Sequence, residues 1–409
     1  MKHLNLLSGQ SPEELNLTQE VFRDFLRQAT HRLLCQVMSE EVSLLCGQKY
    51  FPTSSSDYQR AGSAPGFVRV EGKEEAIQRP RVRKKALKSK SGEVQLLTYQ
   101  QAQSSAVLEE QLLSALKVGS SSRDTAAGVL RSGQRGTSRS QVSRLWEKAG
   151  REFIDDLRSR DLSLNNWLVL MLDGIHLGKN ICAIVALGIS DDGKKHILDF
   201  EIGASENESI STDLMHRLYS RGFCRNGGGH FFCTLDGSRP LKKAVLKLYP
   251  GTPVQRCLVH KGRNLKRALS KKHWGKVDGF LDELRKSGSL KEAENVVKRL
   301  RSFLSGHSLK AMESLDEGGE DLLAFWRVGA PHELKSTLLS TNSIENSFLN
   351  VRRKLGRVSR WRSETDQPDR WLAYALITAE KGFRRVRGFQ ALGSLTAALK
   401  AYSILSKNE

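Results

Sequence analysis

The sequence predicts an α/β fold, and the prediction depends on the order of strand and helix patterns between residues 167 and 259. Three β-rich runs come first, at 167–172, 181–187 and 197–202. The Asp-Asp-Gly-Lys-Lys segment before the third run is a hairpin signal, because Asp and Gly favour tight turns. A helix (211–219), a strand (231–235), a helix (240–248) and a strand (254–259) then alternate. Three successive strands followed by this alternation are typical of a ribonuclease-H-like core.

The rest of the chain is mostly helical. Residues 11–51 carry an apolar stripe at helical spacing, which favours packing or self-association over chemistry. Residues 262–335 are helical and include a capping box at 289–292, and a late helical segment completes the core. We therefore divide the chain into four parts: an N-terminal helical region (1–60), a basic region (61–155), a strand-rich core (156–262 with 336–395) and a helical insertion (263–335).

The charge indicates a polyanionic partner. The 409 residues include 65 Lys and Arg against 45 Asp and Glu, which gives a net charge of +20. Such a field attracts nucleic acid above all. The start of the chain has no signal-peptide pattern, and no apolar stretch approaches the ~18 residues that a membrane span needs. We expect a cytoplasmic, nucleoid-associated protein without a membrane partner.

The basic region contains a candidate helix-turn-helix at 122–148. In its second helix, Arg139, Gln141 and Arg144 face outward, as the residues of a major-groove recognition helix do. An ordinary helical hairpin is the alternative. A cationic segment at 79–85 could follow a phosphate backbone or could be a solvated arm.

Three carboxylates stand in distinctive contexts. Asp173 and Asp236 each end an apolar run, and Glu345 lies on a late helix that leads into Arg352 and Arg353. Phosphodiester chemistry needs an activated oxygen nucleophile and a neutralised phosphate, and two divalent ions provide both. We expect the three acids to hold two Mg²⁺ or Mn²⁺ ions, and the two arginines to contact DNA.

The segment 255–264 follows the second acid and ends its predicted strand beside the site. Cys257 and His260 suggest zinc, but structural zinc takes four ligands and no second pair is obvious, so we reject a zinc knuckle. His260 is interpreted as a phosphate donor or as the support of an acid, and a purely structural histidine is the alternative. The candidate phosphate contacts beside it are Arg256, Lys261, Arg263 and Asn264.

Two tryptophans lie in the helical insertion. Trp274 could stack on an unpaired base, or it could pack in the core. Core packing is the interpretation that we favour for Trp326. Trp361 and Trp371 follow the helix of Glu345, and we expect them to pack that helix on the sheet.

Together these segments resemble the Mutator-type insertion-sequence transposases of bacteria, a DDE recombinase family. The resemblance covers roughly residues 60–390, and its most specific stretches are 235–238, 249–251, 255–264, 206–209, 221–223 and 341–345 with 352–353. It implies a ribonuclease-H-like fold with a helical insertion, metal ligands at Asp173, Asp236 and Glu345, and Cys257 with His260 as a paired signature. The residues after Asp173 and the basic run at 356–361 depart from the family pattern, which suggests a divergent branch.

We therefore expect a DNA transposase that binds the terminal inverted repeats of its element, cleaves DNA strands and joins them to target DNA. Synapsis of two double-stranded ends favours a homodimer or a higher assembly. Two alternatives remain open: a non-mobile DNA-binding protein derived from a transposase, and a ribonuclease-H-like nuclease that cuts without joining.

Overall fold

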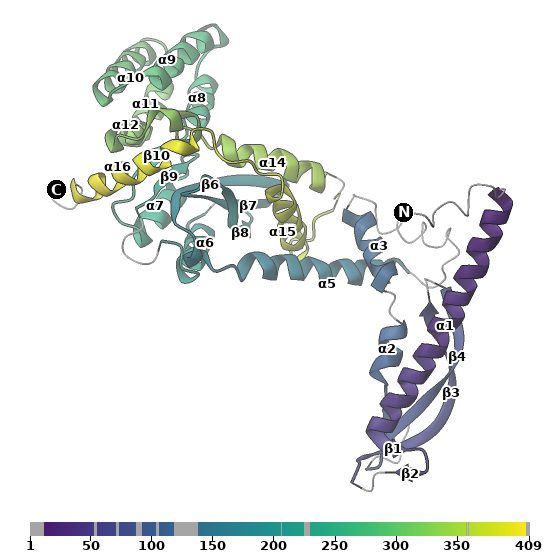
Figure 1. Cartoon of the computed structure of the whole chain (residues 1–409). Coiled ribbons are helices and arrows are strands. Elements are labelled where there is room, and N and C mark those ends of the chain that lie inside the picture. Colours follow the sequence, from purple (N-terminus) through teal and green to yellow (C-terminus); the bar gives the residue numbers. More distant parts are fainter. Residues whose placement is uncertain are drawn as a thin grey trace, which may run out of the picture. The chain divides into compact units, whose positions relative to one another are not determined.

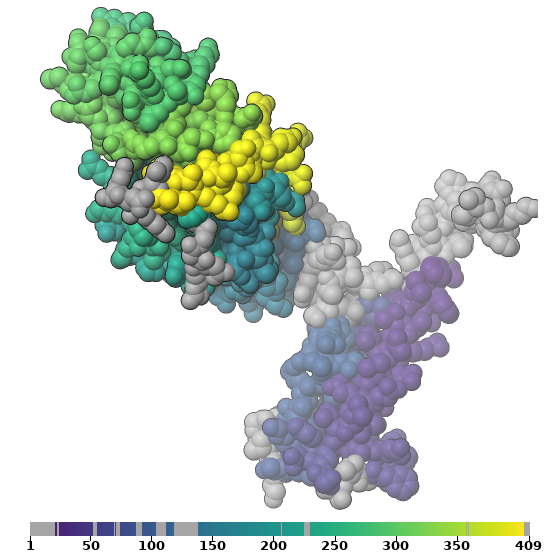
Figure 2. All heavy atoms as spheres, turned by 60° about the vertical axis from the view of Figure 1, so that its left-hand side comes forward, coloured from purple at the N-terminus to yellow at the C-terminus, as the bar shows by residue number. Residues whose placement is uncertain are grey.

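The computed structural model describes residues 12–52, 55–70, 73–86, 92–103, 106–117, 138–205, 207–224, 230–356, 358 and 360–405. The chain divides into two compact units, Met1–Trp146 and Glu147–Glu409. In Figures 1 and 2 the first unit is purple to blue and the second runs from teal to yellow.

The first unit combines one long helix with a small antiparallel sheet. Helix α1 (Pro12–Cys46) packs on the hairpin of β3 (Tyr58–Val70) and β4 (Lys73–Lys84), and β5 (Glu93–Val94) pairs with β4. Met38 and Val42 of α1 join Val68 and Ile77 of the hairpin in one buried cluster. The shorter elements are β1 (Gly47–Gln48), β2 (Phe51–Pro52), α2 (Leu97–Gln103) and α3 (Ala106–Lys117).

This hairpin corrects the sequence-based description of the N-terminal region as mostly helical. Residues 58–70 form a strand despite their Gly and Pro content, and the cationic segment belongs to β4. Arg79 and Arg81 of that segment pair with Glu93 of β5 at 2.9 and 2.6 Å. The sheet therefore neutralises part of the positive charge of the cationic segment at 79–85.

A five-stranded mixed sheet forms the centre of the second unit. Its strands are β6 (Trp167–Gly178), β7 (Ile181–Ser190), β8 (Lys195–Gly203), β9 (Phe232–Leu235) and β10 (Val254–Arg256). Their spatial order is β10-β9-β6-β7-β8. The pairs β6–β7 and β7–β8 are antiparallel, whereas β6–β9 and β9–β10 are parallel. The predicted order of strands and helices is thus confirmed.

Helices cover both faces of this sheet (Figure 1). Side chains alternate along β6, so that Leu170 and Leu172 pack with α6 (Glu208–Ser220) and α7 (Arg239–Leu248) in one cluster. Met171 and Ile175 point to the opposite face and join the cluster of α14 (Asn342–Leu355), α15 (Gln367–Glu380) and α16 (Leu392–Leu405). Asp173 lies between Met171 and Ile175 in this alternation, so its side chain faces the same side of the sheet as theirs.

Between β10 and α14 the described chain is helical, with α8 (Leu258–Arg267), α9 (Trp274–Lys286), α10 (Leu290–Ser305), α11 (Leu309–Gly318), α12 (Ala324–Val328) and α13 (Lys335–Leu338). Ser289 caps α10 as predicted, because its Oγ accepts a hydrogen bond from Glu292 N at 3.3 Å, and the Glu292 carboxylate reaches back one residue further, to accept from Gly288 N at 2.8 Å. Among the described helices, none has the length and apolar character of a membrane span.

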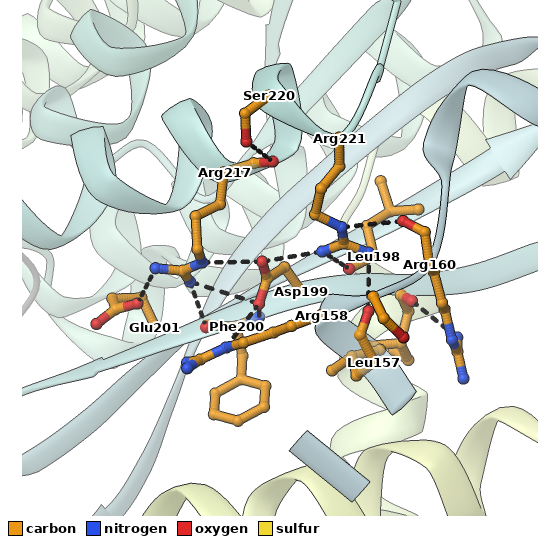
Figure 3. Close-up of polar contacts among 12 residues, drawn as sticks. Leu157, Arg158, Arg160, Leu198, Asp199, Phe200, Glu201, Arg217, Ser220 and Arg221 are labelled. Atoms are coloured by element: carbon orange, nitrogen blue, oxygen red, sulfur yellow. Dashed lines mark hydrogen bonds and ion pairs between the residues drawn. The ribbon is translucent and has the colours of Figure 1, made fainter. Parts of the chain in front are cut away.

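A buried carboxylate ties β8 to its covering helices (Figure 3). Asp199 is fully buried, and its Oδ2 accepts hydrogen bonds from Arg217 Nε at 3.0 Å and from Arg221 Nη1 at 3.1 Å. Arg221 also donates to the carbonyl of Leu157, near the end of α5 (Arg139–Arg158), at 2.8 Å. One acid thus joins the edge strand, α6 and the end of α5.

Candidate active site

Asp173 lies in the middle of β6 and not at its end. The strand continues to Gly178 because residues 173–178 still pair with β7, which corrects the expectation that this acid closes the strand. Its side chain is 4% exposed, and its Oδ1 accepts a hydrogen bond from Gly174 N at 2.9 Å. Burial raises the pKa of Asp173 to about 7; the charge of His260 opposes the rise, and those of Asp236 and Glu345 add to it.

Asp236 follows β9 directly, on the strand that neighbours β6. Its Oδ1 accepts a hydrogen bond from Ser238 N at 2.9 Å, which fixes the turn into α7. Gly237 has a φ of 116°, and a Cβ there would lie 2.3 Å from Arg256 Nε. This glycine therefore lets the Arg256 guanidinium pass close to the backbone beside the acid.

Glu345 lies in the first turn of α14, whose buried face carries Ile344 and Phe348. Its Oε1 is 3.3 Å from His260 Nε2. Arg263 donates to both of its oxygens, Nη1 to Oε1 at 3.2 Å and Nη2 to Oε2 at 3.3 Å. Two cationic side chains of α8 thus hold the third acid.

The prediction that His260 ends a strand is wrong. Strand β10 ends at Arg256, and Cys257 is the N-cap of α8, so His260 lies in the first turn of that helix. The hydrogen bond with Cys257 raises the pKa of His260 to about 9, burial opposes this, and the charges of Asp173 and Glu345 support it. Burial raises the pKa of the Cys257 thiol, but hydrogen bonds from His260 and Thr341 outweigh that effect and leave it below its usual range.

The ligand atoms of Asp173, His260 and Glu345 all lie within 4.8 Å of one another. They come from a central strand, the N-terminus of α8 and the N-terminus of α14. Asp236 is outside this group of three, although its charge acts on Asp173. The arrangement offers hard oxygen donors and one imidazole, which suits a divalent cation.

Two predicted DNA contacts, Arg256 and Lys261, are directed into the protein instead. Arg256 is 8% exposed and its Nη1 donates to Glu317 at 2.9 Å. Lys261 is fully buried, and its Nζ lies 3.0 Å from Glu317 Oε2 and also donates to the carbonyl of Ser314. As they lie here, these cations hold α11 against α8 and β10, and we withdraw them as phosphate contacts. Sequence reasoning missed Glu317, which has no local motif around it.

The other predicted contacts keep accessible positions. On α5, Arg139, Gln141 and Arg144 are exposed while Val142 and Trp146 are buried, as predicted. Ser138 caps this helix, since its Oγ accepts from Gln141 N at 3.2 Å. The helix continues to Arg158, ten residues past its expected end, and the first helix of the candidate helix-turn-helix lies outside the described residues. Three further candidates are exposed or partly buried, namely Arg352, Arg353 and Asn264.

The tryptophans separate into surface and core positions. Trp274 is 37% exposed, and its indole nitrogen donates to the carbonyl of Lys266 at 3.0 Å. Trp326 is buried and donates to the carbonyl of Ser287 at 2.9 Å, which confirms its core role. Trp361 lies against Gly178 of β6, so it contacts the sheet, while its predicted role in packing the helix of Glu345 stays a prediction.

The sequence of the chain matches a known family of proteins. Residues 2–367 match the family described as "Transposase, Mutator family", and the chain belongs to this family. DNA transposition is accordingly its class of function.

Three characterised relatives illustrate the similarity. The chain is 30% identical over 225 residues to the transposase for insertion sequence element IS6120 of Mycolicibacterium smegmatis, covering 53% of this chain and 67% of the relative. It is 27% identical over 256 residues to the transposase for IS905 of Lactococcus lactis (60% and 62%) and 29% identical over 227 residues to that for IS256 in transposon Tn4001 of Staphylococcus aureus (53% and 56%). The aligned region thus spans between 56% and 67% of the length of these three relatives.

Proposed function

We propose that this chain is a DDE-type DNA transposase in which Asp173, Asp236 and Glu345 hold two divalent ions, Mg²⁺ or Mn²⁺. The observation that carries the proposal is the convergence of Asp173 and Glu345, which are 172 positions apart in sequence, with ligand atoms within 4.8 Å. Asp236 supplies the third carboxylate from the neighbouring parallel strand.

The strand order supports a ribonuclease-H-like core. Three antiparallel strands (β8, β7, β6) continue into two parallel ones (β9, β10), with β6 at the centre. We assign this core to residues 156–262 and 336–395, with 263–335 as the helical insertion and 61–155 as the DNA-binding region. The helical run itself begins at Leu258, because α8 crosses the proposed boundary.

The residues fit a divalent cation on electrostatic grounds. Asp173 is deeply buried, and the negative charges of two further acids act on it. The single imidazole of His260 compensates this negative charge poorly. Bound cations relieve this repulsion, and oxygen donors suit Mg²⁺ and Mn²⁺. When bound, such ions supply an activated oxygen nucleophile and neutralise charge at the scissile phosphate.

The protein's own residues position the acids and the DNA. His260 and Arg263 orient Glu345, and both of its oxygens are engaged by Arg263 in this structure. A cation at Glu345 must therefore compete with the Arg263 guanidinium, which is half-exposed and can turn outward to a DNA phosphate. Arg352 and Arg353 of α14 extend this basic surface for double-stranded DNA, and Arg139, Gln141 and Arg144 offer separate exposed DNA contacts in the first unit.

The experiment is a cleavage and joining assay with purified full-length protein and the DNA that flanks its gene. Asp236→Asn keeps the size of the side chain and removes its charge, and Asp213→Asn on the exposed face of α6 is the matched control. We expect cleavage and joining with Mg²⁺ or Mn²⁺ for wild type and the control. Asp236→Asn should bind the ends and cut nothing.

Unchanged activity of Asp236→Asn would refute the site. Cleavage that is never followed by joining would point to a nuclease. Specific binding of the ends without metal-dependent cleavage in wild type would point to a DNA-binding protein.

A further inference from the structure

The segment that joins α15 to α16 (Figure 1) carries a cluster of cations in the second unit. Its Lys and Arg side chains are exposed, whereas Val386 among them is buried. Lys195 of β8 lies beside this segment, with its Nζ 5.3 Å from the centre of the Phe383 ring. We call the cationic residues of this cluster the basic platform, namely Lys195, Lys381, Arg384, Arg385 and Arg387.

The protein holds the backbone of the basic platform in place. Val386 N donates a hydrogen bond to the carbonyl of Gly193, in the turn between β7 and β8, at 2.9 Å. Thr337 Oγ1 donates to the carbonyl of Arg387 at 3.3 Å. A basic segment without such contacts would be a solvated arm. Here the cations project from a fixed backbone, which lowers the entropic cost of binding a ligand.

The arginines of the basic platform have no carboxylate partner, since no described acid lies within 4.0 Å of them. Most other arginines in the described part of the second unit do form such an ion pair. Acids near the platform are too few to neutralise it. Asp192 is already paired with Lys194 at 2.8 Å, which leaves Asp191 and Glu333. The surface therefore keeps an excess of positive charge.

From this surface we propose that the basic platform binds the phosphate backbone of double-stranded DNA, whatever its sequence. Guanidinium groups match phosphate oxygens in geometry and charge. A protein partner would need apolar contacts at the centre of its interface, but the apolar side chains of the segment are buried or partly buried. The inference rests on the proposed function in one respect, that the chain acts on DNA. It needs neither the metal ions nor the three acids.

The basic platform is separate from the candidate active site. Gly193, which holds the segment, follows Ser190, and Ser190 pairs with Trp167 at the start of β6. Asp173 lies six residues further along β6, so the platform is about 20 Å from it along the sheet. About six base pairs of duplex span this distance. The platform therefore contacts DNA away from the scissile phosphate. This DNA is either the remainder of the end duplex or the target duplex, and the test separates the two.

The test is fluorescence anisotropy of labelled duplexes with the full-length protein in EDTA, so that no strand is cut. The first titration uses the duplex that flanks the gene. The second adds a labelled, unrelated duplex to protein that is already saturated with the first. The variant carries Arg384→Gln, Arg385→Gln and Arg387→Gln. The matched control removes equal charge from three accessible arginines that are paired with acids, by Arg285→Gln, Arg299→Gln and Arg301→Gln.

The variant should bind at least about tenfold more weakly than wild type at about 100 mM salt. This loss should appear in the first titration if the platform holds the end duplex, and in the second alone if it holds the target duplex. The plot of log affinity against log salt concentration should become shallower by about two to three, because each lost phosphate contact removes about one unit of slope.

Two further proteins show whether the charge itself is responsible. Replacement by lysine, with Arg384→Lys, Arg385→Lys and Arg387→Lys, keeps the charges and should keep the salt dependence of wild type. The control should bind both duplexes as wild type does. Far-UV circular dichroism should be the same for every variant, because the substituted side chains are accessible.

Equal affinity of the glutamine variant and wild type in both titrations would overturn the proposal. A control that weakens binding as much would also overturn it, since the effect would then be one of net charge alone. A wild type that binds neither duplex would contradict this inference together with the proposed function. A wild type that binds DNA through the platform but cuts nothing with metal would refute only the proposed active site.

Discussion

Asp173→Asn should stabilise the metal-free protein while it abolishes catalysis. The side chain is almost fully buried, and its pKa rises from 3.8 to about 7. At about 1.4 kcal/mol per pKa unit, this shift corresponds to about 4 kcal/mol of lost stability once the group is ionised in both states. A carboxyl group with a raised pKa costs no stability below its pKa in the unfolded chain, because it is protonated in both states there. The cost grows as pH rises from 3.8 and is complete above about pH 7.

Two effects reduce the gain that the variant can show. An asparagine keeps the acceptor for Gly174 N, but its buried amide N–H groups need partners, which costs about 1–3 kcal/mol. His260 also loses part of the attraction that raises its pKa to about 9. We therefore expect a net gain in the free energy of unfolding of about 1–3 kcal/mol near pH 8, and a smaller gain or a loss near pH 5.

The assay is urea unfolding in EDTA at about pH 8 and about pH 5, for wild type, Asp173→Asn and the exposed control Asp155→Asn. The difference between the two pH values is decisive, because constant costs of the substitution cancel in it. Asp155→Asn should leave the free energy of unfolding unchanged at both. If Asp173→Asn is no more favourable at the higher pH than at the lower, Asp173 is not the strained acid that the structure indicates.

Three further predictions concern the neighbours of the site. Arg263→Gln should tighten Mn²⁺ binding several-fold in calorimetry, because it frees both oxygens of Glu345. It should also weaken DNA binding, because it removes a cation that can contact a phosphate. An Mn²⁺ affinity equal to that of wild type would contradict competition between Arg263 and the metal for Glu345. Asp199→Ala should cost about 3–5 kcal/mol in urea unfolding, since it leaves a cluster of arginines without its buried counter-charge; a cost below about 1 kcal/mol would contradict the importance of this carboxylate. Gly237→Ala should lower the free energy of unfolding by at least about 1–3 kcal/mol and should slow cleavage, because it combines an unfavourable φ with a clash against Arg256. A variant that cleaves as fast as wild type would argue against this packing of Arg256 on Gly237.

Local signals were enough to predict the central sheet. The strands β6 to β9 have continuous apolar runs separated by turn residues, and such patterns depend on neighbouring residues alone. The prediction failed where β6 passes Asp173, since a polar residue in an apolar run resembles a strand end. It also failed for 58–84, because Pro65 and Pro80 argue against strands, yet both residues lie within the paired segments of the hairpin.

The sequence singled out the three acids, and His260 as a possible support of one of them, but it did not indicate which of the nearby basic residues would be buried or paired. Each acid is preceded or followed by a local motif, whereas the partners of the nearby cations come from distant parts of the chain. Lys261 and Glu317 are 56 positions apart, so no local pattern indicates that this lysine is buried. Arg263 was predicted to bind phosphate, and its pairing with Glu345 became visible only in the folded protein.

The most direct test of the central claim is an excision and integration assay in cells. A marker is bracketed by the DNA that naturally flanks the gene, and wild type is compared with Asp236→Ala and with the surface control Asp213→Asn. We predict movement of the marker with wild type and the control, and none with Asp236→Ala at equal protein level. Equal movement with Asp236→Ala would show that the three carboxylates do not form the active site.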